Sequence, residues 1–277
     1  MRALALHPDV IVVEGSLYAT NTVVLRAGAA AGSDAGPLRV IEPGEEEASE
    51  VFVIDSPVLP DELASLGSLL EQARFRQPDA LLATHGDWDH LLAVQAFPGL
   101  SIGVAESTAR RLAASPEQAL RELERFDAGL YLRREPLQLP DLQSLPVPGR
   151  LDLGELELEL HRADGHTEDG MAIFAPWAGV LICGDYLSPI EIPLIGQGGS
   201  IGAYSATLDR LDGLLARSRY AVPGHGRVLE AQEAKRILLE DRAYLEALAR
   251  EGSDAPLPAG RDGELCRGDH AANAATL

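Results

Sequence analysis

The stretch Thr84-His85-Gly86-Asp87-Trp88-Asp89-His90 follows directly on the short apolar run Ala80–Ala83. The apolar run predicts a buried β-strand, and the polar block predicts the loop at its end. Four side chains with nitrogen or oxygen donors therefore fall within six residues, namely His85, Asp87, Asp89 and His90. Because α/β folds place their sites on loops at strand ends, this density of donors is typical of metal coordination.

Three further predicted strands end in the same way. Alternation of leucine and acidic residues over 156–160 predicts a half-buried strand that leads to Gly165-His166-Thr167. The apolar runs at 180–183 and 220–222 lead to Gly184-Asp185 and to Pro223-Gly224-His225-Gly226. We therefore expect His166, Asp185 and His225 to join the residues at 85–90 in one site.

The ordered set of these motifs resembles the metallo-β-lactamase superfamily, whose first motif reads Thr-His-x-His-x-Asp-His, over about residues 10–250. The segment from Asp185 through His225 to a long helix looks like the glyoxalase II or lactonase layout. The resemblance implies an α/β fold, a four-layer αββα sandwich with a dinuclear metal site at one edge of its two sheets. It also implies the ligands: His85, Asp87 and His166 for the first metal ion, Asp89, His90 and His225 for the second, and Asp185 bridging both.

Asp87 departs from the family pattern, which has histidine at this position. The formal charges of two divalent ions, Asp89, Asp185 and a bridging hydroxide sum to +1. The charge of the Asp87 carboxylate brings that sum to zero. A neutral centre acidifies its water less than a cationic one, so we expect a higher pKa for that water. The oxygen ligand also makes the first site harder. We expect two divalent ions, with Zn²⁺ as the first choice and Fe or Mn as alternatives.

Asp89 and Asp185 are also the predicted catalytic residues. Trp88 lies inside the first motif and is a candidate to line the site mouth, with packing as the alternative interpretation. Tyr186 and Tyr204 follow the bridging aspartate or its loop and are further candidates for substrate contact. Four arginines are interpreted as solvated charges on helices or loops, namely Arg110, Arg111, Arg133 and Arg134.

The composition excludes some classes of partner. The 277 residues include 23 basic and 43 acidic residues, for a net charge of −20. Nucleic acids and anionic membranes need a basic face, so we expect neither as a partner and a small molecule as substrate. His7, Pro8 and Asp9 interrupt the first apolar run, and the two cysteines form no disulfide framework. These features predict a cytoplasmic protein.

We expect a catalytic domain over residues 1–252 and a C-terminal tail over 253–277, with room for one or two turns of helix over 270–277. Residues 27–50 are rich in Gly, Ala and Glu and predict an exposed, mobile insertion. Ser115 is the predicted cap of a helix that ends near Phe126. Four prolines between Pro136 and Pro148 predict a loop.

Three function classes follow. The first is a metal-dependent hydrolase in which a bridging hydroxide attacks an ester, thioester or lactone carbonyl. The second is a non-haem iron redox protein of the same fold, either flavodiiron-like or persulfide dioxygenase-like. Flavodiiron proteins carry glutamate where this chain has Asp87, but they need a flavin domain for which this chain has no room. The third is a degenerate binding protein, against which the near-complete ligand set argues.

Overall fold

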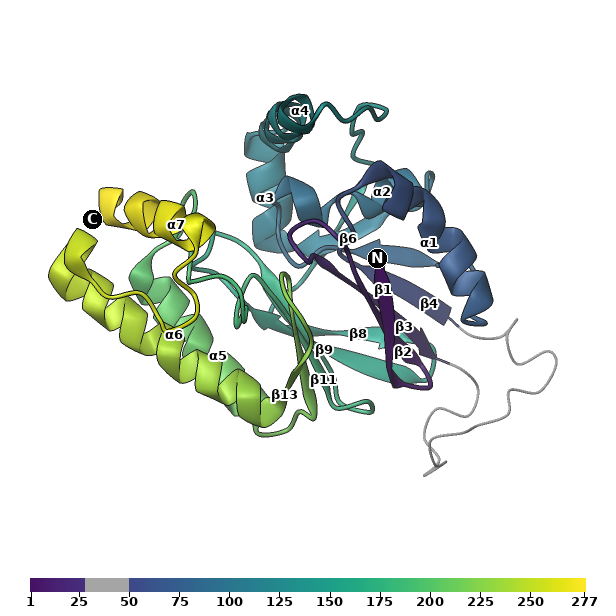
Figure 1. Ribbon diagram of the computed structural model, residues 1–277. Coiled ribbons are helices and arrows are strands. Elements are labelled where there is room, and N and C mark those ends of the chain that lie inside the picture. The colour runs from purple at the N-terminus through teal and green to yellow at the C-terminus, as the bar shows by residue number, and fades with distance from the viewer. Residues whose placement is uncertain (28–49) are drawn as a thin grey trace.

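The computed structural model describes residues 1–27 and 50–277, and most of the predicted insertion falls outside the described residues. Two β-sheets lie against each other, and helices cover the outer face of each sheet (Figure 1). The predicted α/β fold, a four-layer αββα sandwich, is therefore confirmed.

The first sheet has seven strands in sequence order. These are β1 (Arg2–His7), β2 (Val10–Glu14), β3 (Asn21–Ala27), β4 (Glu50–Ile54), β5 (Ala80–Leu82), β6 (Ile102–Ala105) and β7 (Leu142–Leu145). Strands β1 to β4 pair antiparallel, and β4 to β7 pair parallel. Because parallel strands end at the same edge, the loops that follow β4 and β5 lie side by side.

The second sheet has six strands. Their order is β13 (Leu229–Glu230), β12 (Tyr220–Pro223), β11 (Val180–Gly184), β10 (Met171–Ala175), β9 (Leu156–Arg162) and β8 (Gly149–Leu153). Only β11 and β12 pair parallel within this sheet, and the other neighbours are antiparallel. The loops after β11 and β12 therefore leave from one edge, which is where Asp185 and His225 lie.

The helices divide between the two sheets. On the side of the first sheet are α1 (Pro60–Gln72), α2 (Ala93–Ala96), α3 (Glu106–Ala114) and α4 (Gln118–Leu130). On the side of the second sheet are α5 (Ile201–Leu215), α6 (Ala231–Glu251) and α7 (Glu264–Ala275). Two short 3₁₀ helices are η1 (Trp88–His90) and η2 (Gly252–Asp254). Within the described ranges, no helix has both the length and the apolar character needed to cross a membrane.

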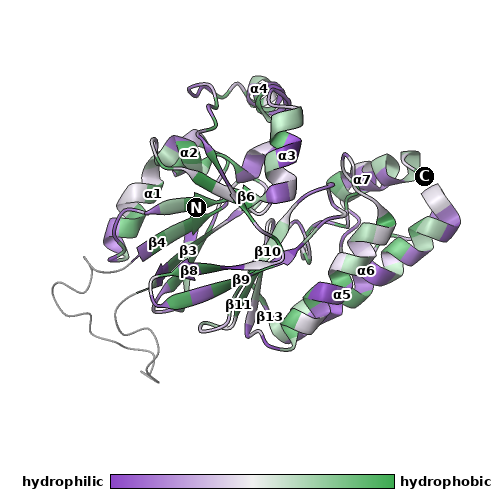
Figure 2. Ribbon diagram, turned by 180° about the vertical axis from the view of Figure 1, so that it is seen from behind, coloured by the Kyte–Doolittle hydropathy of each residue, from purple (hydrophilic) through white to green (hydrophobic). Residues whose placement is uncertain are grey.

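Three hydrophobic clusters correspond to the three interfaces of the sandwich. Leu66 and Leu123 belong to the cluster beneath the helices of the first sheet. Leu25 and Ile173 belong to the cluster between the sheets, and Leu208 to the one beneath α5 and α6. Figure 2 shows the corresponding pattern, with hydrophobic residues on the strands and hydrophilic stripes along the outer helices. Burying both faces of each sheet is what fixes four layers.

Two local predictions were wrong. Ser115 does not cap a helix, because it lies at the end of α3, and α4 begins only at Gln118 without a side-chain cap. Residues 136–148 are not entirely loop, because Leu142–Leu145 forms β7 at the edge of the first sheet. Both Gln143 and Ser144 are exposed, so this edge strand lacks the apolar pattern that reveals buried strands.

The C-terminal residues contain more structure than the sequence predicts. The helix α7 spans Glu264–Ala275 and buries Cys266 and Asn273. The Asn273 side chain accepts a hydrogen bond from the Ile195 backbone amide (2.7 Å) and donates one to the Pro193 carbonyl (2.7 Å). A division between a catalytic domain and a C-terminal segment at residue 252 stays a proposal, but this segment packs on the loop at 188–195.

Candidate metal centre

The predicted ligand residues come together from four loops at one edge of the two sheets. His85, Asp87, Asp89 and His90 follow β5, His166 follows β9, Asp185 follows β11, and His225 follows β12. All four histidines are buried. Each of these strands ends in a loop, and the four loops meet at one edge of the two sheets.

Glycines allow the loops to approach each other closely. Gly165 has a φ of +122°, and a Cβ there would lie 2.1 Å from the Tyr204 backbone nitrogen. A Cβ on Gly224 would lie 2.1 Å from Oδ1 of Asp185 and 3.0 Å from the His90 ring. The glycine before His225 therefore leaves the space in which the Asp185 carboxylate sits.

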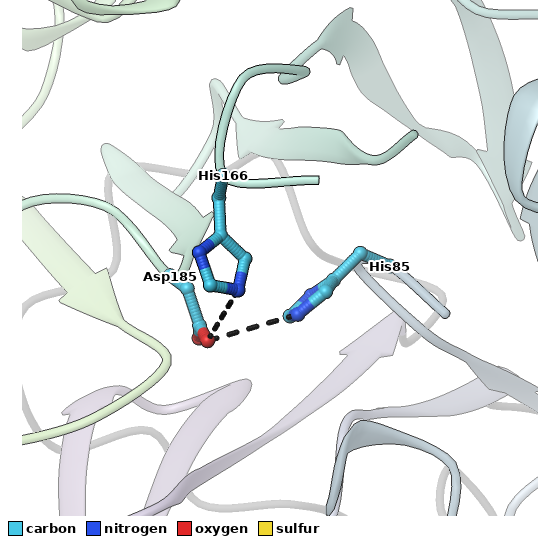
Figure 3. A group of neighbouring side chains, drawn as sticks. All are labelled: His85, His166 and Asp185. Atoms are coloured by element: carbon cyan, nitrogen blue, oxygen red, sulfur yellow. Dashed lines mark ion pairs between the residues drawn. The ribbon is translucent and has the colours of Figure 1, made fainter. Parts of the chain in front are cut away.

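The two oxygens of Asp185 face different pairs of histidines. Its Oδ2 lies 3.4 Å from Nε2 of His166 and 3.7 Å from Nε2 of His85, as Figure 3 shows. Its Oδ1 lies 3.1 Å from Nε2 of His90 and 3.4 Å from Nε2 of His225. One carboxylate with an oxygen toward each pair has the geometry of a bridge between two metal ions.

Each histidine pair also has a carboxylate of its own. Oδ2 of Asp87 lies 3.3 Å from Nε2 of His166 and 3.5 Å from Nε2 of His85. Oδ2 of Asp89 lies 3.4 Å from Nε2 of His225. Two compact donor groups result, one with His85, His166 and Asp185 and one with Asp89, His90 and His225.

The Nδ1 atoms of three of the four histidines already have polar partners. Nδ1 of His90 lies 3.0 Å from Oδ2 of Asp55, while Nδ1 of His166 and of His225 contact the Leu194 and Tyr18 carbonyls. In the described part of the chain, Nε2 of His85, Nε2 of His90 and Oδ1 of Asp185 are buried and make no hydrogen bond, since the 3.1 Å contact between the last two atoms is an ion-pair distance without hydrogen-bond geometry. A buried polar atom without a partner costs free energy, and coordination to a metal ion removes that cost. The residues therefore fit two divalent ions.

Asp55 supports the centre from behind. It adopts a φ of +58°, and its carboxylate accepts hydrogen bonds from the Thr84 amide (2.8 Å) and the Thr84 hydroxyl (2.9 Å). Holding Nδ1 of His90 against Asp55 keeps the Nε2 lone pair directed at the centre. Asp55 was not among the predicted site residues, although it directly follows β4, the neighbour of β5.

The side chains strongly perturb one another electrostatically. Burial alone would raise the pKa values of Asp87 and Asp185, but the neighbouring histidines hold both well below their usual range. Burial would lower the histidine pKa values, but the hydrogen bond to Asp87 and the Asp185 charge raise that of His166 to about 9. The Asp185 and Glu191 charges likewise raise the pKa of His225 to about 10.

Loading the chelator-treated protein with divalent ions at pH 7 is expected to release protons. Both His166 and His225 are protonated at this pH without metal, because their pKa values are about 9 and about 10. Each ring must lose its Nε2 proton to bind an ion, so metal affinity rises roughly tenfold per pH unit for each proton released. Calorimetric titration in buffers of different ionisation enthalpy measures the number of protons released per ion bound. Binding without proton release would contradict the ligand assignment.

A cavity of about 200 Å³ opens onto this centre. Five of the ligand candidates line it, namely Asp87, Asp89, His166, Asp185 and His225. The other lining residues are Tyr18, Glu191, Ile192, Leu194, Leu265 and Asp269. Of the described residues that line the cavity, none is lysine or arginine. The cavity can therefore take a small, partly apolar molecule close to the two donor groups.

The three predicted substrate residues do not line this cavity among the described residues. Trp88 packs on Phe126 of α4, with ring centroids 4.6 Å apart. Tyr186 and Tyr204 are each 2% exposed; the Tyr186 hydroxyl accepts from the His166 amide, and the Tyr204 hydroxyl donates to the Asp185 carbonyl. The two tyrosines therefore bond to the backbone of the loops that carry His166 and Asp185, and they do not face the cavity.

The interpretation of all four arginines as solvated charges was wrong for two of them. The Arg111 side chain is 10% exposed and pairs with Asp87 (2.7 Å) and Asp169 (2.8 Å). The Arg134 side chain is 5% exposed and pairs with Asp127 (2.8 Å). Each is next in sequence to an exposed arginine, and no local pattern distinguishes the two members of such a pair.

Comparison with known proteins gives a family match. The sequence profile of the metallo-beta-lactamase superfamily matches residues 37–225, which is more than half of the chain. Among curated proteins, no sequence matches this chain.

Solved structures share the fold at low sequence identity. A metallo-beta-lactamase family protein from Thermus thermophilus is 20% identical, with a TM-score of 0.62 over 92% of this chain and 86% of that one. A metallo-beta-lactamase from Pontibacter korlensis is 15% identical, with a TM-score of 0.59 over 86% of this chain and 97% of that one. The protein TTHA1623, in a di-iron-bound form, is 20% identical, with a TM-score of 0.54 over 82% of this chain and 97% of that one. At these identities, the similarity extends to the fold alone.

Proposed function

The chain belongs to the metallo-β-lactamase superfamily, and from this premise we propose that it is a metal-dependent hydrolase of ester, thioester or lactone bonds. The observation that carries the proposal is the Asp185 carboxylate, which has one oxygen toward His85 and His166 and the other toward His90 and His225. Two divalent ions, with Zn²⁺ as the expected metal, fit this arrangement.

The proposed chemistry divides between the ions and the protein. Bound divalent ions supply Lewis acidity and an activated water molecule. The His85, Asp87, His166 set and the Asp89, His90, His225 set fix where that chemistry occurs, and Asp185 holds the two sets together. Asp89 faces the cavity, so its carboxylate is placed to take up the water proton as the carbonyl is attacked.

The cavity walls favour uncharged substrates. Glu191 and Asp269 add two carboxyl groups to the wall, and in the described chain no basic side chain lines the cavity. Burial raises the pKa of Glu191 to about 7, so this wall carries partial negative charge at neutral pH. Together with the net charge of −20, the wall repels strongly anionic molecules. Nucleic acid is disfavoured as a partner on the same grounds.

A substrate panel tests both the reaction class and the charge preference. The metal-loaded protein is expected to hydrolyse neutral lactones, simple esters or uncharged thioesters at least tenfold faster than phosphodiesters or polyanionic thioesters. Because salt screens long-range repulsion, the ratio should shrink between low and moderate ionic strength. Initial rates at equal substrate concentration measure it. Faster hydrolysis of a phosphodiester than of every neutral acyl substrate would refute the charge argument.

Iron-dependent redox chemistry is the second candidate. The Asp87 carboxylate gives the first donor group a hard oxygen where the family pattern has a histidine nitrogen, which favours iron over zinc. A solved structure of similar fold is in a di-iron-bound form. Metal analysis of protein purified without added metal separates the candidates: zinc supports the hydrolase, and two equivalents of iron support the redox protein.

A further inference from the structure

Arg111 on α3 places a partly buried guanidinium beside the candidate metal centre. Its Nη2 lies 2.7 Å from Oδ1 of Asp87, and its Nη1 lies 2.8 Å from Oδ1 of Asp169. Asp169 in turn accepts hydrogen bonds from the Gly86 amide (3.0 Å) and the Thr167 hydroxyl (2.8 Å). The guanidinium therefore connects the loop that carries His85 with the loop that carries His166.

The two carboxylate oxygens of Asp87 have different partners. Oδ1 is held by Arg111, while Oδ2 faces Nε2 of His85 and Nε2 of His166. A carboxylate whose first oxygen is fixed by a charge-assisted hydrogen bond presents only the second to an ion. Arg111 thus gives Asp87 the single donor atom that a histidine would have at this position.

The same contact changes the charge balance at the centre. The Asp87 carboxylate adds one negative charge to the centre, and the guanidinium, 2.7 Å from Asp87 and 2.8 Å from Asp169, offsets one of these two carboxylate charges. The sequence-based expectation of a neutral centre counted Asp87 without this partner. Asp169 shares the guanidinium, and its oxygens are already bound by Gly86 and Thr167.

On the basis of the proposed metal centre, we propose that Arg111 is the positioning residue that makes Asp87 a one-oxygen ligand of the first ion. Asp87 and Arg111 then act as a matched pair that takes the place of one neutral ligand. A histidine at position 87 next to Arg111 is a mismatch, because Nη2 of Arg111 then loses its carboxylate acceptor and faces an imidazole, while only Asp169 remains to pair with the guanidinium.

A double-mutant cycle on metal binding tests the pair. Chelator-treated wild type, Arg111→Met, Asp87→His and the double variant are titrated with Co²⁺, with a chromophoric chelator as competitor. Arg110→Met is the matched control, because Arg110 is the exposed neighbour on α3. Each single substitution is expected to weaken one of the two Co²⁺ sites by about 10- to 100-fold. The control is expected to bind like wild type.

The double variant decides between positioning and general damage. Loss of the Asp169 contact is common to both Arg111→Met backgrounds and cancels in the cycle. The double variant is expected to bind the first Co²⁺ more tightly than either single variant, with a visible spectrum altered from wild type. If the losses multiply instead, or if Arg111→Met binds like wild type, the pairing is refuted. Arg111→Lys, which keeps the charge but not the two-point contact, should bind between wild type and Arg111→Met.

Failure of the proposed function has a different signature. If wild type itself binds no Co²⁺ with its apo fold intact by circular dichroism, the metal centre is refuted together with the pair. If wild type binds two ions and Arg111→Met also binds two with unchanged affinity, the metal centre stands and only the pairing falls. Should Arg111→Met not fold, Arg111→Lys replaces it in the cycle, alone and combined with Asp87→His.

Discussion

Replacing Asp185 with alanine is expected to weaken both metal sites at once and to abolish hydrolysis. The Asp185 carboxylate has one oxygen 3.4 Å from Nε2 of His166 and the other 3.1 Å from Nε2 of His90, so the first donor group loses a member and the second loses the oxygen that faces its histidines. We expect each affinity to fall by more than about a hundredfold, beyond the effect of losing a supporting partner of a ligand. Hydrolysis should fall by about a thousandfold or more, since metal ions supply several kcal/mol of transition-state stabilisation.

Asp185→Asn gives a sharper form of the same test. An amide keeps the shape of the side chain but offers only one oxygen, so one ion should be lost and the other retained with reduced affinity. Metal content by elemental analysis, with the rate on a neutral ester, measures both variants. Asp152→Asn on β8 is the control, since Asp152 is exposed and distant from β11 in its sheet. An Asp185→Ala variant that keeps two tightly bound ions would exclude the bridge.

The local pattern of the chain was sufficient to predict that the candidate ligands lie in one site, whereas the four-layer architecture was predicted from the resemblance of the ordered motifs to the family. His85, His166, Asp185 and His225 each follow a short apolar run, and a strand end is a feature that periodicity reveals. The burial of Tyr186 was not predictable in this way. Asp185 and Tyr186 both lie in the turn after β11, where the alternation of a strand no longer applies.

The residues that support and surround the ligands were not predictable in this way. Asp55, Arg111 and Asp169 are far from their partners in sequence, and carboxylates and arginines are usually exposed. Their burial follows from how α3 and the loops pack, which no short window of sequence contains. Glu191 and Asp269 reach the cavity wall for the same reason, because α7 folds back over the loop after β11.

The C-terminal segment is held to this loop by a buried ion pair. Nη1 of Arg261 lies 2.6 Å from Oδ1 of Asp241 on α6, and it also donates to the Glu191 carbonyl (2.9 Å) and the Ser188 carbonyl (3.3 Å). Both charged side chains are almost completely buried, with 3% and 1% exposed. Removing one partner of such a pair leaves an uncompensated buried charge, which costs more than the intact pair contributes.

Arg261→Met is therefore expected to lower the free energy of unfolding by about 3–5 kcal/mol, measured by urea titration with circular dichroism. The exposed Arg121–Glu117 pair on α4 provides the control, and Arg121→Met should cost less than about 0.5 kcal/mol. Burial raises the pKa of Asp241 to about 7. That value holds with Arg261 in place, and loss of the guanidinium raises the pKa further. Only above about pH 7 does the folded variant keep a proton that folded wild type has lost, so the destabilisation should grow from pH 7 to pH 9. Adding Asp241→Leu removes the unpaired charge and should recover most of the loss. A variant as stable as Arg121→Met at pH 8 would show that Arg261 does not anchor this segment.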